Sequence, residues 1–334
     1  MRAATEPPEA HGTARDAVRL LVATPSGLSH TRFRDLAGFL SPGDCLVVNV
    51  SATVAAAVDG RRDVATITVH FATELPDGTW VVELRPGRRA DGPVTDVRPG
   101  QVVDLPSGRL HVVEPYPGDH DGDVPRTWRA RVVVGGCVLA YLEEHGRPIT
   151  YAYVQDDWPL ASYQTVFARE PGSAEMPSAA RPFSTELVTD LVASGVAVVP
   201  VTLHTGLSSA ESGEPPLPER FEVPAATARL VNATRVAGGR VVAVGTTVTR
   251  ALETVAGPDG TVRPGSGWTE LVLGPRRPAR VVNGLVTGWH APGASHLRLL
   301  EAVAGPDLVG RAYAAAREHG YRWHEFGDSA LLLP

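Results

Sequence analysis

The sequence predicts an α/β layered main domain that carries an inserted small antiparallel β-barrel domain. Two observations lead to this prediction. After residue 135, apolar strand-like runs alternate with helical patterns, as in a layered α/β sheet. Between residues 54 and 134, short alternating segments are separated by Gly, Pro and Asp, which is typical of a small barrel or sandwich. We therefore expect a discontinuous main domain over residues 1–53 and 135–334, interrupted by a barrel domain over residues 54–134.

The first part of the main domain should contain two strands, because two apolar runs flank a helix-like segment. The second run, CLVVN, is short and apolar without alternation, as expected for a buried strand. The first dozen residues are rich in Pro, Glu and Ala and should be loosely ordered. In chain order we expect a strand at 17–24, a turn at 26–30, a short helix at 33–40 and a strand at 45–49.

The insert shows the period-two alternation of half-buried strands. In DVATITVHF (63–71), apolar side chains alternate with two threonines and a histidine. Several segments of this kind at close spacing favour a small antiparallel barrel. The other expected strands lie at 79–86, 101–105, 108–116 and 126–134.

The second part of the main domain begins with a helical pattern that ends at Gly146. Downstream, apolar strands alternate with helices, which favours a layered sheet. We expect strands at 195–203, 240–246 and 270–274, and helices around 225–236, 250–255 and 308–319.

Composition excludes several classes of protein. The chain has 334 residues, 31 basic and 37 acidic side chains and a net charge of −6, so it lacks the global basic field of a strong nucleic-acid binder. Two cysteines, Cys45 and Cys137, are too few for a disulfide framework or a cysteine-built metal site, which fits a reducing compartment. No signal-peptide pattern opens the chain, and the apolar runs are too short to span a bilayer. We expect a cytoplasmic protein without a membrane partner or a metal.

A first candidate functional segment is the loop from Tyr163 to Ser173. It combines an aromatic residue, the Arg169–Glu170 pair and a Pro-Gly turn, with neither helical nor strand period. The segment is either part of a site or a structural loop that contains a salt bridge.

A second candidate lies where a strand ends in Gly245 and the next helix begins with Thr246 and Thr247 and contains Arg250. Such a junction offers free N–H groups and a positive dipole end to an anionic ligand group. Helix capping alone explains the same pattern.

Two histidines form a third candidate. His204 follows the strand at 195–203, and His290 lies in a break between a predicted strand and a helix. Open α/β sheets bind ligands at such strand ends, where a histidine can act as a general acid or base, although a lone histidine can also be an ordinary surface residue. No HExxH, CxxC, GxSxG, P-loop or GxGxxG signature occurs, so zinc protease, redox, serine hydrolase, NTPase and simple dinucleotide-binding functions lose support.

Taken together and in chain order, the segments resemble the S-adenosylmethionine:tRNA ribosyltransferase-isomerase family of queuosine biosynthesis. The predicted insert falls where that family carries its small barrel domain. The matching segments are RFRDLAGFLSPGDCLVVN (32–49), YQTVFAREPGS (163–173), VTLHTGL (201–207), GGRVVAVGTTVTRALE (238–253), VTGWHAP (286–292) and GYRWHEFGDSALLL (320–333).

The resemblance implies an enzyme that uses S-adenosylmethionine as a ribosyl donor. The ribosyl unit passes to the aminomethyl group of a 7-deazaguanine base in tRNA and rearranges to give epoxyqueuosine, with release of adenine and methionine and without a metal. Because the sulfonium acidifies the ribose C5′ hydrogens, such a site needs a base there and a proton donor for adenine.

By position in the matching segments we expect His204, His290 and Glu170 to be catalytic. Arg169 and Glu170 would be charged anchors, and Thr246, Thr247 and Arg250 would be donors to an anionic part of the ligand. The full set of expected substrate-binding residues is Asn49, Ser51, Tyr163, Gln164, Arg169, Gly172, Ser173, Thr202, Gly206, Gly245, Thr246, Thr247, Arg250 and Trp289.

The chain also departs from the family pattern. The family typically has Asn-Asp-Thr-Arg at 49–52 and a histidine at Pro182, and its His-Lys-Met-His stretch is replaced here by the proline-rich segment 209–218. Two alternatives therefore stay open: a paralogue with a small-molecule acceptor, and a noncatalytic S-adenosylmethionine-binding protein.

A tRNA partner would favour a local basic surface, because arginine side chains release counterions from phosphates. The arginines of the insert would supply it if they met on one face of the barrel, whereas their alternative role is a solvated outer strand face. The residues concerned are Arg85, Arg88, Arg89, Arg126, Arg129 and Arg131.

Overall fold

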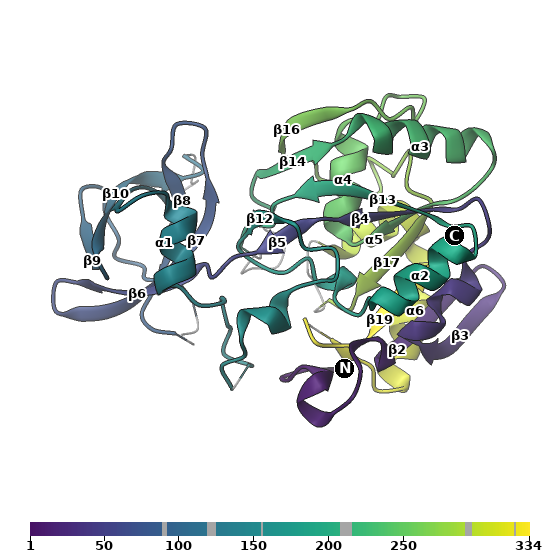
Figure 1. The fold of residues 1–334 in the computed structure, drawn as a ribbon, viewed down its shortest axis with the longest axis horizontal. Coiled ribbons are helices and arrows are strands. Elements are labelled where there is room, and N and C mark those ends of the chain that lie inside the picture. Colours follow the sequence, from purple (N-terminus) through teal and green to yellow (C-terminus); the bar gives the residue numbers. More distant parts are fainter. Residues whose placement is uncertain (89–91, 119–124, 155, 208–215, 291–295, 324) are drawn as a thin grey trace.

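The computed structural model describes the chain except residues 89–91, 119–124, 155, 208–215, 291–295 and 324 (Figure 1). A nine-stranded mixed sheet covered by helices and a separate closed barrel make up the architecture, which confirms the predicted fold class. Across the sheet the strands are β16 (Gly265–Thr269), β14 (Glu219–Val223), β13 (Ala197–Leu203), β4 (Cys45–Asn49), β15 (Val241–Val244), β17 (Gly284–Gly288), β19 (Ser329–Leu332), β2 (Arg19–Thr24) and β3 (Gly27–Arg32).

The centre of this sheet is parallel. Strands β13, β4, β15 and β17 run in one direction, with Val47 of β4 opposite both Val199 of β13 and Ala243 of β15. Antiparallel strands flank them, β14 beside β13 and β19 beside β17. The central strands are short and mostly apolar, as strands covered on both faces must be. Their carboxyl ends meet at one edge of the sheet.

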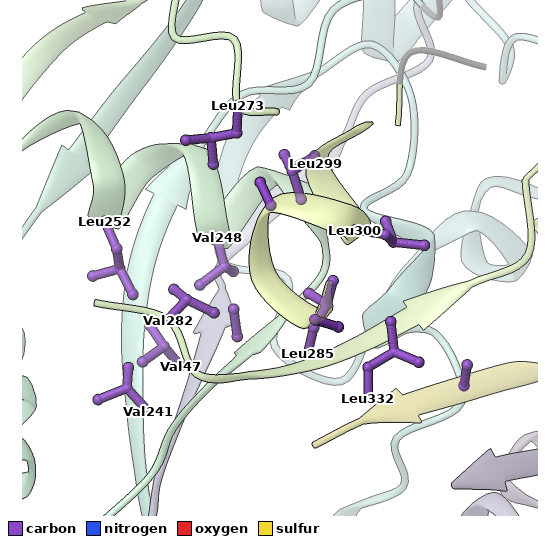
Figure 2. Close-up of a cluster of buried hydrophobic side chains, with 14 of the residues drawn as sticks. Val47, Val241, Val248, Leu252, Leu273, Val282, Leu285, Leu299, Leu300 and Leu332 are labelled. Atoms are coloured by element: carbon purple, nitrogen blue, oxygen red, sulfur yellow. The ribbon is translucent and has the colours of Figure 1, made fainter. Parts of the chain in front are cut away.

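Helices cover both faces of the sheet. Alternate strand residues point to opposite faces, and the residues on both faces are apolar. Val47 and Leu285 belong to the apolar cluster with α3 to α6, as Figure 2 shows for α4 and α5, whereas Leu46 and Val286 pack against α2 and a 3-10 helix. The helices are α2 (Thr185–Ala193), α3 (Ala225–Val236), α4 (Thr246–Thr254), α5 (His296–Ala304) and α6 (Pro306–Glu318), and the 3-10 helix is Phe33–Phe39.

The barrel closes through six strands and encloses its own core. Helix α1 (Val138–His145) packs on it, because Tyr141 and Leu142 join the apolar cluster of the barrel interior. At Gly60 a Cβ would lie 2.8 Å from the carbonyl oxygen of Asp104, so closure at this point requires glycine. The domain limits at residues 54 and 134 stay a prediction. Around the barrel the strands are β10 (Gly108–Tyr116), β11 (Thr127–Val134), β8 (Trp80–Arg85), β7 (Ala65–Glu74), β6 (Ala57–Arg62) and β9 (Val102–Leu105).

Two small parallel pairs complete the fold. Strand β5 (Ser51–Thr53) pairs with β12 (Glu170–Ser173), and both lie between the barrel and the main sheet (Figure 1). Strand β1 (Arg2–Ala3) pairs with β18 (Arg322–Trp323). The expectation of a loosely ordered first dozen residues is wrong, since this pairing extends the chain start along the main domain and buries Ala4.

Two local predictions are also wrong. Residues 26–30 lie mostly in strand β3, whose polar side chains suit an edge strand with one solvated face. Residues 270–274 are not a strand. The strand β16 precedes them, and Leu273 of that run is buried in the main core without pairing in the sheet. Helix α2 and strand β14 were not predicted.

A buried carboxylate organises one end of the barrel. Glu83 accepts hydrogen bonds from Arg85 Nε at 2.7 Å and Arg126 Nε at 2.5 Å, and His70 Nδ1 lies 3.4 Å from it. Burial by itself would raise the pKa of Glu83, but the neighbouring His70 ring and the charges of Arg126 and Arg85 lower that pKa to about 2. The carboxylate therefore stays ionised inside the barrel.

We expect Glu83→Gln to lower the free energy of unfolding by about 3–5 kcal/mol, because the substitution removes the buried negative charge that pairs with Arg85 and Arg126. The exposed Glu74→Gln on β7 is the matched control and should change stability by less than about 0.5 kcal/mol. Since the pKa of Glu83 is lowered from 4.5 to about 2, its contribution is present above pH 4.5 and is lost as pH falls toward 2. Urea unfolding of both variants at pH 7 and pH 3 measures this, and an equal loss at the two pH values would contradict it.

Candidate active site

Residues predicted to act in the site follow each of the four parallel strands. Asn49 ends β4, His204 follows β13, Gly245 follows β15 and Trp289 follows β17. Because the four strands are in register, these residues lie along one edge of the sheet. Ligands of open α/β sheets bind outside the carboxyl ends of the strands, so this edge is the candidate site.

Asn49 joins the ends of β4 and β13. Its Nδ2 donates to the carbonyl of Leu203 at 2.8 Å, and its Oδ1 accepts from the backbone N–H groups of Leu203 and Ser51, both at 3.0 Å. The side chain is fully buried, and Nδ2 also lies 3.5 Å from Thr247 Oγ1. Asn49 thus holds the strand ends and touches the first turn of α4.

Ser51, Ser173 and His204 form a hydrogen-bonded chain beside this edge. Ser51 Oγ lies 2.7 Å from Ser173 Oγ and 2.8 Å from His204 Nδ1, and the backbone N–H of Thr205 donates to Ser173 Oγ at 2.9 Å. Burial, assisted by the charge of Arg220, lowers the pKa of His204 to about 4. The imidazole is therefore neutral at neutral pH.

Gly172 makes the placement of His204 possible. Its φ is +154°, and a Cβ at this position would lie 2.4 Å from His204 Nδ1. Strand β12 can therefore pass against the imidazole only with glycine here. Three predicted residues, Gly172, Ser173 and His204, are thus brought together by the pairing of β5 with β12.

A cavity of about 270 Å³ opens at the same edge. Its lining includes Thr205, Gly245, Thr246 and Thr247. Gly245 has φ +95° and precedes the first turn of α4, whose backbone N–H groups have no side-chain cap. An anionic ligand group is favoured at such a helix start.

Trp289 and His290 form another wall of this cavity. Trp289 is 2% exposed and packs edge-on against Tyr313. His290 Nε2 lies 3.3 Å from Thr287 Oγ1, and its ring stacks on His296 with the centroids 4.5 Å apart. His290 also lines a second cavity of about 480 Å³, together with residues of α5 and α6, so His290 borders both cavities.

Two carboxylates that sequence reasoning missed, Glu175 and Glu325, complete the lining. The hydroxyl of Tyr151 donates to Glu175 Oε1. Burial and the charge of Glu175 raise the pKa of Glu325 to about 8, although Arg181 acts in the opposite direction. No local pattern marks either residue. Glu175 follows Ser173 by two positions and Glu325 lies inside a matching segment, so only proximity to motifs could have drawn attention to them.

Several predicted residues lie away from the cavity lining. Arg169 and Glu170 are exposed on the chain that leads into and forms β12. Tyr163 is buried beside Phe326, and the Gln164 side chain exchanges hydrogen bonds with the backbone of Thr53. These contacts support the loop between the barrel and the sheet.

Arg250 and Gly206 are tied to Glu219. The Arg250 guanidinium forms an ion pair with Glu219 and donates to the carbonyls of Thr269 at 3.0 Å and Leu271 at 3.1 Å. Gly206 N–H donates to Glu219 Oε1 at 3.1 Å. Thr202 lies in β13, opposite Glu222 of β14. The role of Arg250 as a ligand donor stays a prediction, and its described contacts are internal.

The arginines of the barrel are largely neutralised. Arg85 and Arg126 bind Glu83, Arg129 binds Asp77 and Glu114, and Arg88 binds Asp59. Arg131 is exposed on β11, and Arg89 lies outside the described residues. Ion pairing therefore reduces the positive potential that a phosphate backbone would meet on this surface.

Within the described ranges, no three His, Cys, Asp or Glu side chains form a group that could hold a metal ion. In the same part of the chain, no helix has the length and apolar character needed to cross a membrane.

The fold and the edge cavity define a class of protein: an α/β domain with a barrel and with a cavity at the carboxyl ends of its parallel strands. The family described as "Queuosine biosynthesis protein" matches residues 1–332, and the chain belongs to this family. The resemblance stated from the motifs is thereby confirmed, and the family is one of transferase/isomerase enzymes.

Similar proteins carry a shared name. The chain is 37% identical to the S-adenosylmethionine:tRNA ribosyltransferase-isomerase of Symbiobacterium thermophilum, with 96% of this chain and 94% of that protein covered. The protein of the same name from Acidiphilium cryptum is 37% identical over 95% of this chain and 93% of its own. The crystal structure of S-adenosylmethionine tRNA ribosyltransferase from Thermotoga maritima superposes with a TM-score of 0.53 at 28% identity, covering 99% and 96% of the two chains.

We expect Gly172→Ala to displace the His204 ring, because the added Cβ would lie 2.4 Å from Nδ1. With the ring pushed toward solvent, its pKa should rise from about 4 toward the ordinary 6.5. Histidine NMR titration of the variant measures this shift. Gly38→Ala, where a Cβ meets nothing within 4 Å, is the control and should leave the His204 titration unchanged. A His204 pKa that stays near 4 in Gly172→Ala would refute the steric argument.

Proposed function

We propose that this protein transfers the ribosyl unit of S-adenosylmethionine to a 7-deazaguanine base of tRNA and isomerises it, giving epoxyqueuosine and releasing adenine and methionine. The observation that carries the proposal is the edge cavity, in which the start of α4 meets Trp289 and His290 in a chain of the queuosine biosynthesis family. The relatives are named for S-adenosylmethionine and tRNA, which supports both substrates.

The polar groups in the lining of the cavity suit the donor. The start of α4 with Thr246 and Thr247 suits the methionine carboxylate, since helix N-termini stabilise anions. Thr205 and Trp289 add hydrogen-bond donors to the walls. Arg169 and Glu170 do not line the cavity, so we assign them to the acceptor, which reaches the site from solvent.

The two histidines take different roles in this proposal. His204 has a pKa of about 4 and is a weak base at neutral pH, so its hydrogen-bonded chain with Ser51 and Ser173 serves to position the strand ends. His290 lines the cavity beside Thr287 and is the better proton carrier for the ribose C5′ hydrogen or for departing adenine. Glu170 would assist at the acceptor side.

The alternative to this proposal is a paralogue in which a small molecule, and not tRNA, is the acceptor. The relatives' names favour tRNA, whereas the net charge of −6 and the ion-paired barrel arginines favour a smaller acceptor. The deciding experiment incubates the protein with S-adenosylmethionine alone, with unmodified tRNA and with 7-deazaguanine-bearing tRNA, and measures adenine and methionine by chromatography. Adenine released only with the modified tRNA supports the proposal. Donor binding without adenine release points to a small acceptor or a noncatalytic binder.

We expect His290→Ala to lower kcat for adenine release by about 100-fold or more, because general acid–base catalysis contributes about 10²–10⁴-fold. The Kd of S-adenosylmethionine should change far less than kcat. Calorimetry and a chromatographic rate assay measure the two quantities. Unchanged turnover in this variant would remove His290 from the proton-carrying role.

The pH dependence separates His204 from His290. Because the pKa of His204 is lowered to about 4, its neutral form predominates above pH 5, and protonation of His204 should reduce activity only below that value. The pH–rate profile of the wild-type protein between pH 5 and 8 should be unchanged in shape in His204→Asn, even where the rate itself is lower. An acidic limb between pH 6 and 7 that disappears in this variant would contradict the assignment.

A further inference from the structure

Two carboxylates of the cavity have no part in the proposed chemistry so far. Glu175 follows β12 and Glu325 precedes β19, and both line the cavity together with Trp289 and the start of α4. Two loops about 150 residues apart thus bring two acidic groups to one wall. Burial raises the pKa of Glu325 to about 8, the charge of Glu175 adds to the effect, and Arg181 opposes it. Ionisation of Glu325 beside Glu175 is therefore unfavourable unless a cation binds between them.

The groups that face this pair come from several elements. The Tyr151 hydroxyl donates a hydrogen bond to Glu175. Burial and the charges of Glu325 and Glu175 raise the pKa of Tyr153. Arg181 lies 4.9 Å from the centroid of the Phe326 ring, and its Nη2 binds Glu9 Oε2 at 2.9 Å. The positive charge of Arg181 is therefore shared with another carboxylate. His290 and His296 line the same cavity, and burial lowers the pKa of His296.

Unsatisfied donors in the same walls point independently to a ligand. Trp289 is 2% exposed, and its indole N–H has no acceptor among the residues that the structure describes. The hydroxyl of Thr205, also in the lining, has no hydrogen-bond partner in the described chain. Buried polar groups without partners are costly, and a ligand with acceptor atoms would satisfy both. The cavity therefore suits a molecule that has acceptor atoms and a positive charge.

We propose that Glu175 and Glu325 form a subsite for a cationic group of the donor, either the sulfonium or the ammonium of S-adenosylmethionine. This inference rests on the proposed function and adds the way in which the site recognises the charge of its donor. A cation between two carboxylates removes their mutual repulsion, and Trp289 and Trp323, which also line the cavity, are aromatic side chains of the kind that attract cations. Because the cation stabilises the ionised form of Glu325, its binding should displace a proton from that carboxyl group.

The test compares three probes by isothermal calorimetry. S-adenosylmethionine has both cations, S-adenosylhomocysteine has only the ammonium, and 5′-methylthioadenosine has neither. The proteins are the wild type, Glu175→Gln, Glu325→Gln and the exposed control Glu143→Gln on α1. Glutamine keeps an acceptor oxygen for Tyr151 and removes like-charge repulsion, so both site variants should fold, which thermal unfolding checks.

We expect each site variant to weaken S-adenosylmethionine binding at pH 7.5 by tenfold or more and to leave 5′-methylthioadenosine binding within threefold. Loss of affinity for S-adenosylmethionine alone identifies the sulfonium as the bound group. A parallel loss for S-adenosylhomocysteine identifies the ammonium. Either pattern supports the subsite, provided that Glu143→Gln behaves like the wild type.

The pH dependence is the second readout. Between pH 6.0 and 7.5 the affinity of the wild type for S-adenosylmethionine should rise by up to about tenfold per pH unit, since one proton is displaced below the pKa of Glu325. The rise should vanish in Glu325→Gln, whereas any titration of the free ligand amine is common to both proteins. If the wild type binds all three probes alike, or the variants keep its affinities, the subsite is overturned while the donor assignment stands. If the wild type binds none of them, the donor assignment fails and the subsite fails with it.

Discussion

The parallel pairing of β4 with β13 and β15 is the constraint on which the site depends. It brings the ends of strands that are far apart in the chain to one edge, and the fully buried Asn49 locks two of those ends through three hydrogen bonds. Each strand then delivers a different chemical group: a histidine from β13, a helix start from β15 and an aromatic wall from β17. A slip of one residue in this register would point the Asn49 side chain to the opposite face of the sheet, because side chains alternate along a strand.

Burial has three different outcomes for the protonation of titratable groups in this molecule. At His204 burial favours the neutral base, and at Glu325 burial and a neighbouring charge favour the neutral acid. At Glu83 hydrogen bonds and two guanidinium groups overcome the same desolvation and hold the carboxylate ionised. The partners present at each site decide the outcome, since desolvation penalises every charge. In the barrel the buried charge is paired within the protein, whereas we propose that a cationic ligand pairs with the carboxylates of the cavity.

The barrel is joined to the site through a short stretch of chain. Strand β5 continues from β4 toward the barrel, and β12 pairs beside it with Gly172 against the His204 ring. Glu175 lies on the continuation of β12 and accepts a hydrogen bond from the hydroxyl of Tyr151. The centroid of the Tyr151 ring lies 5.4 Å from Cζ of Arg85 in the barrel. Side chains in contact therefore connect the barrel interior to the cavity wall. An acceptor held by the barrel would lie next to the groups that we propose as the donor site.

The sequence by itself determined the layered α/β class, the barrel insert and the residues at the strand ends, because hydrophobic period and strand-end positions are local signals. The same reasoning placed Gly172, Ser173, His204 and Thr246 among the site residues, and the structure brings the first three together. Tertiary structure alone decided that the apolar run at 270–274 packs as a loop, that Arg250 is bound to Glu219, and that Glu175 meets Glu325. The physical reason is that the pairing of distant charges and the burial of a segment depend on what lies opposite in space, which no local pattern records.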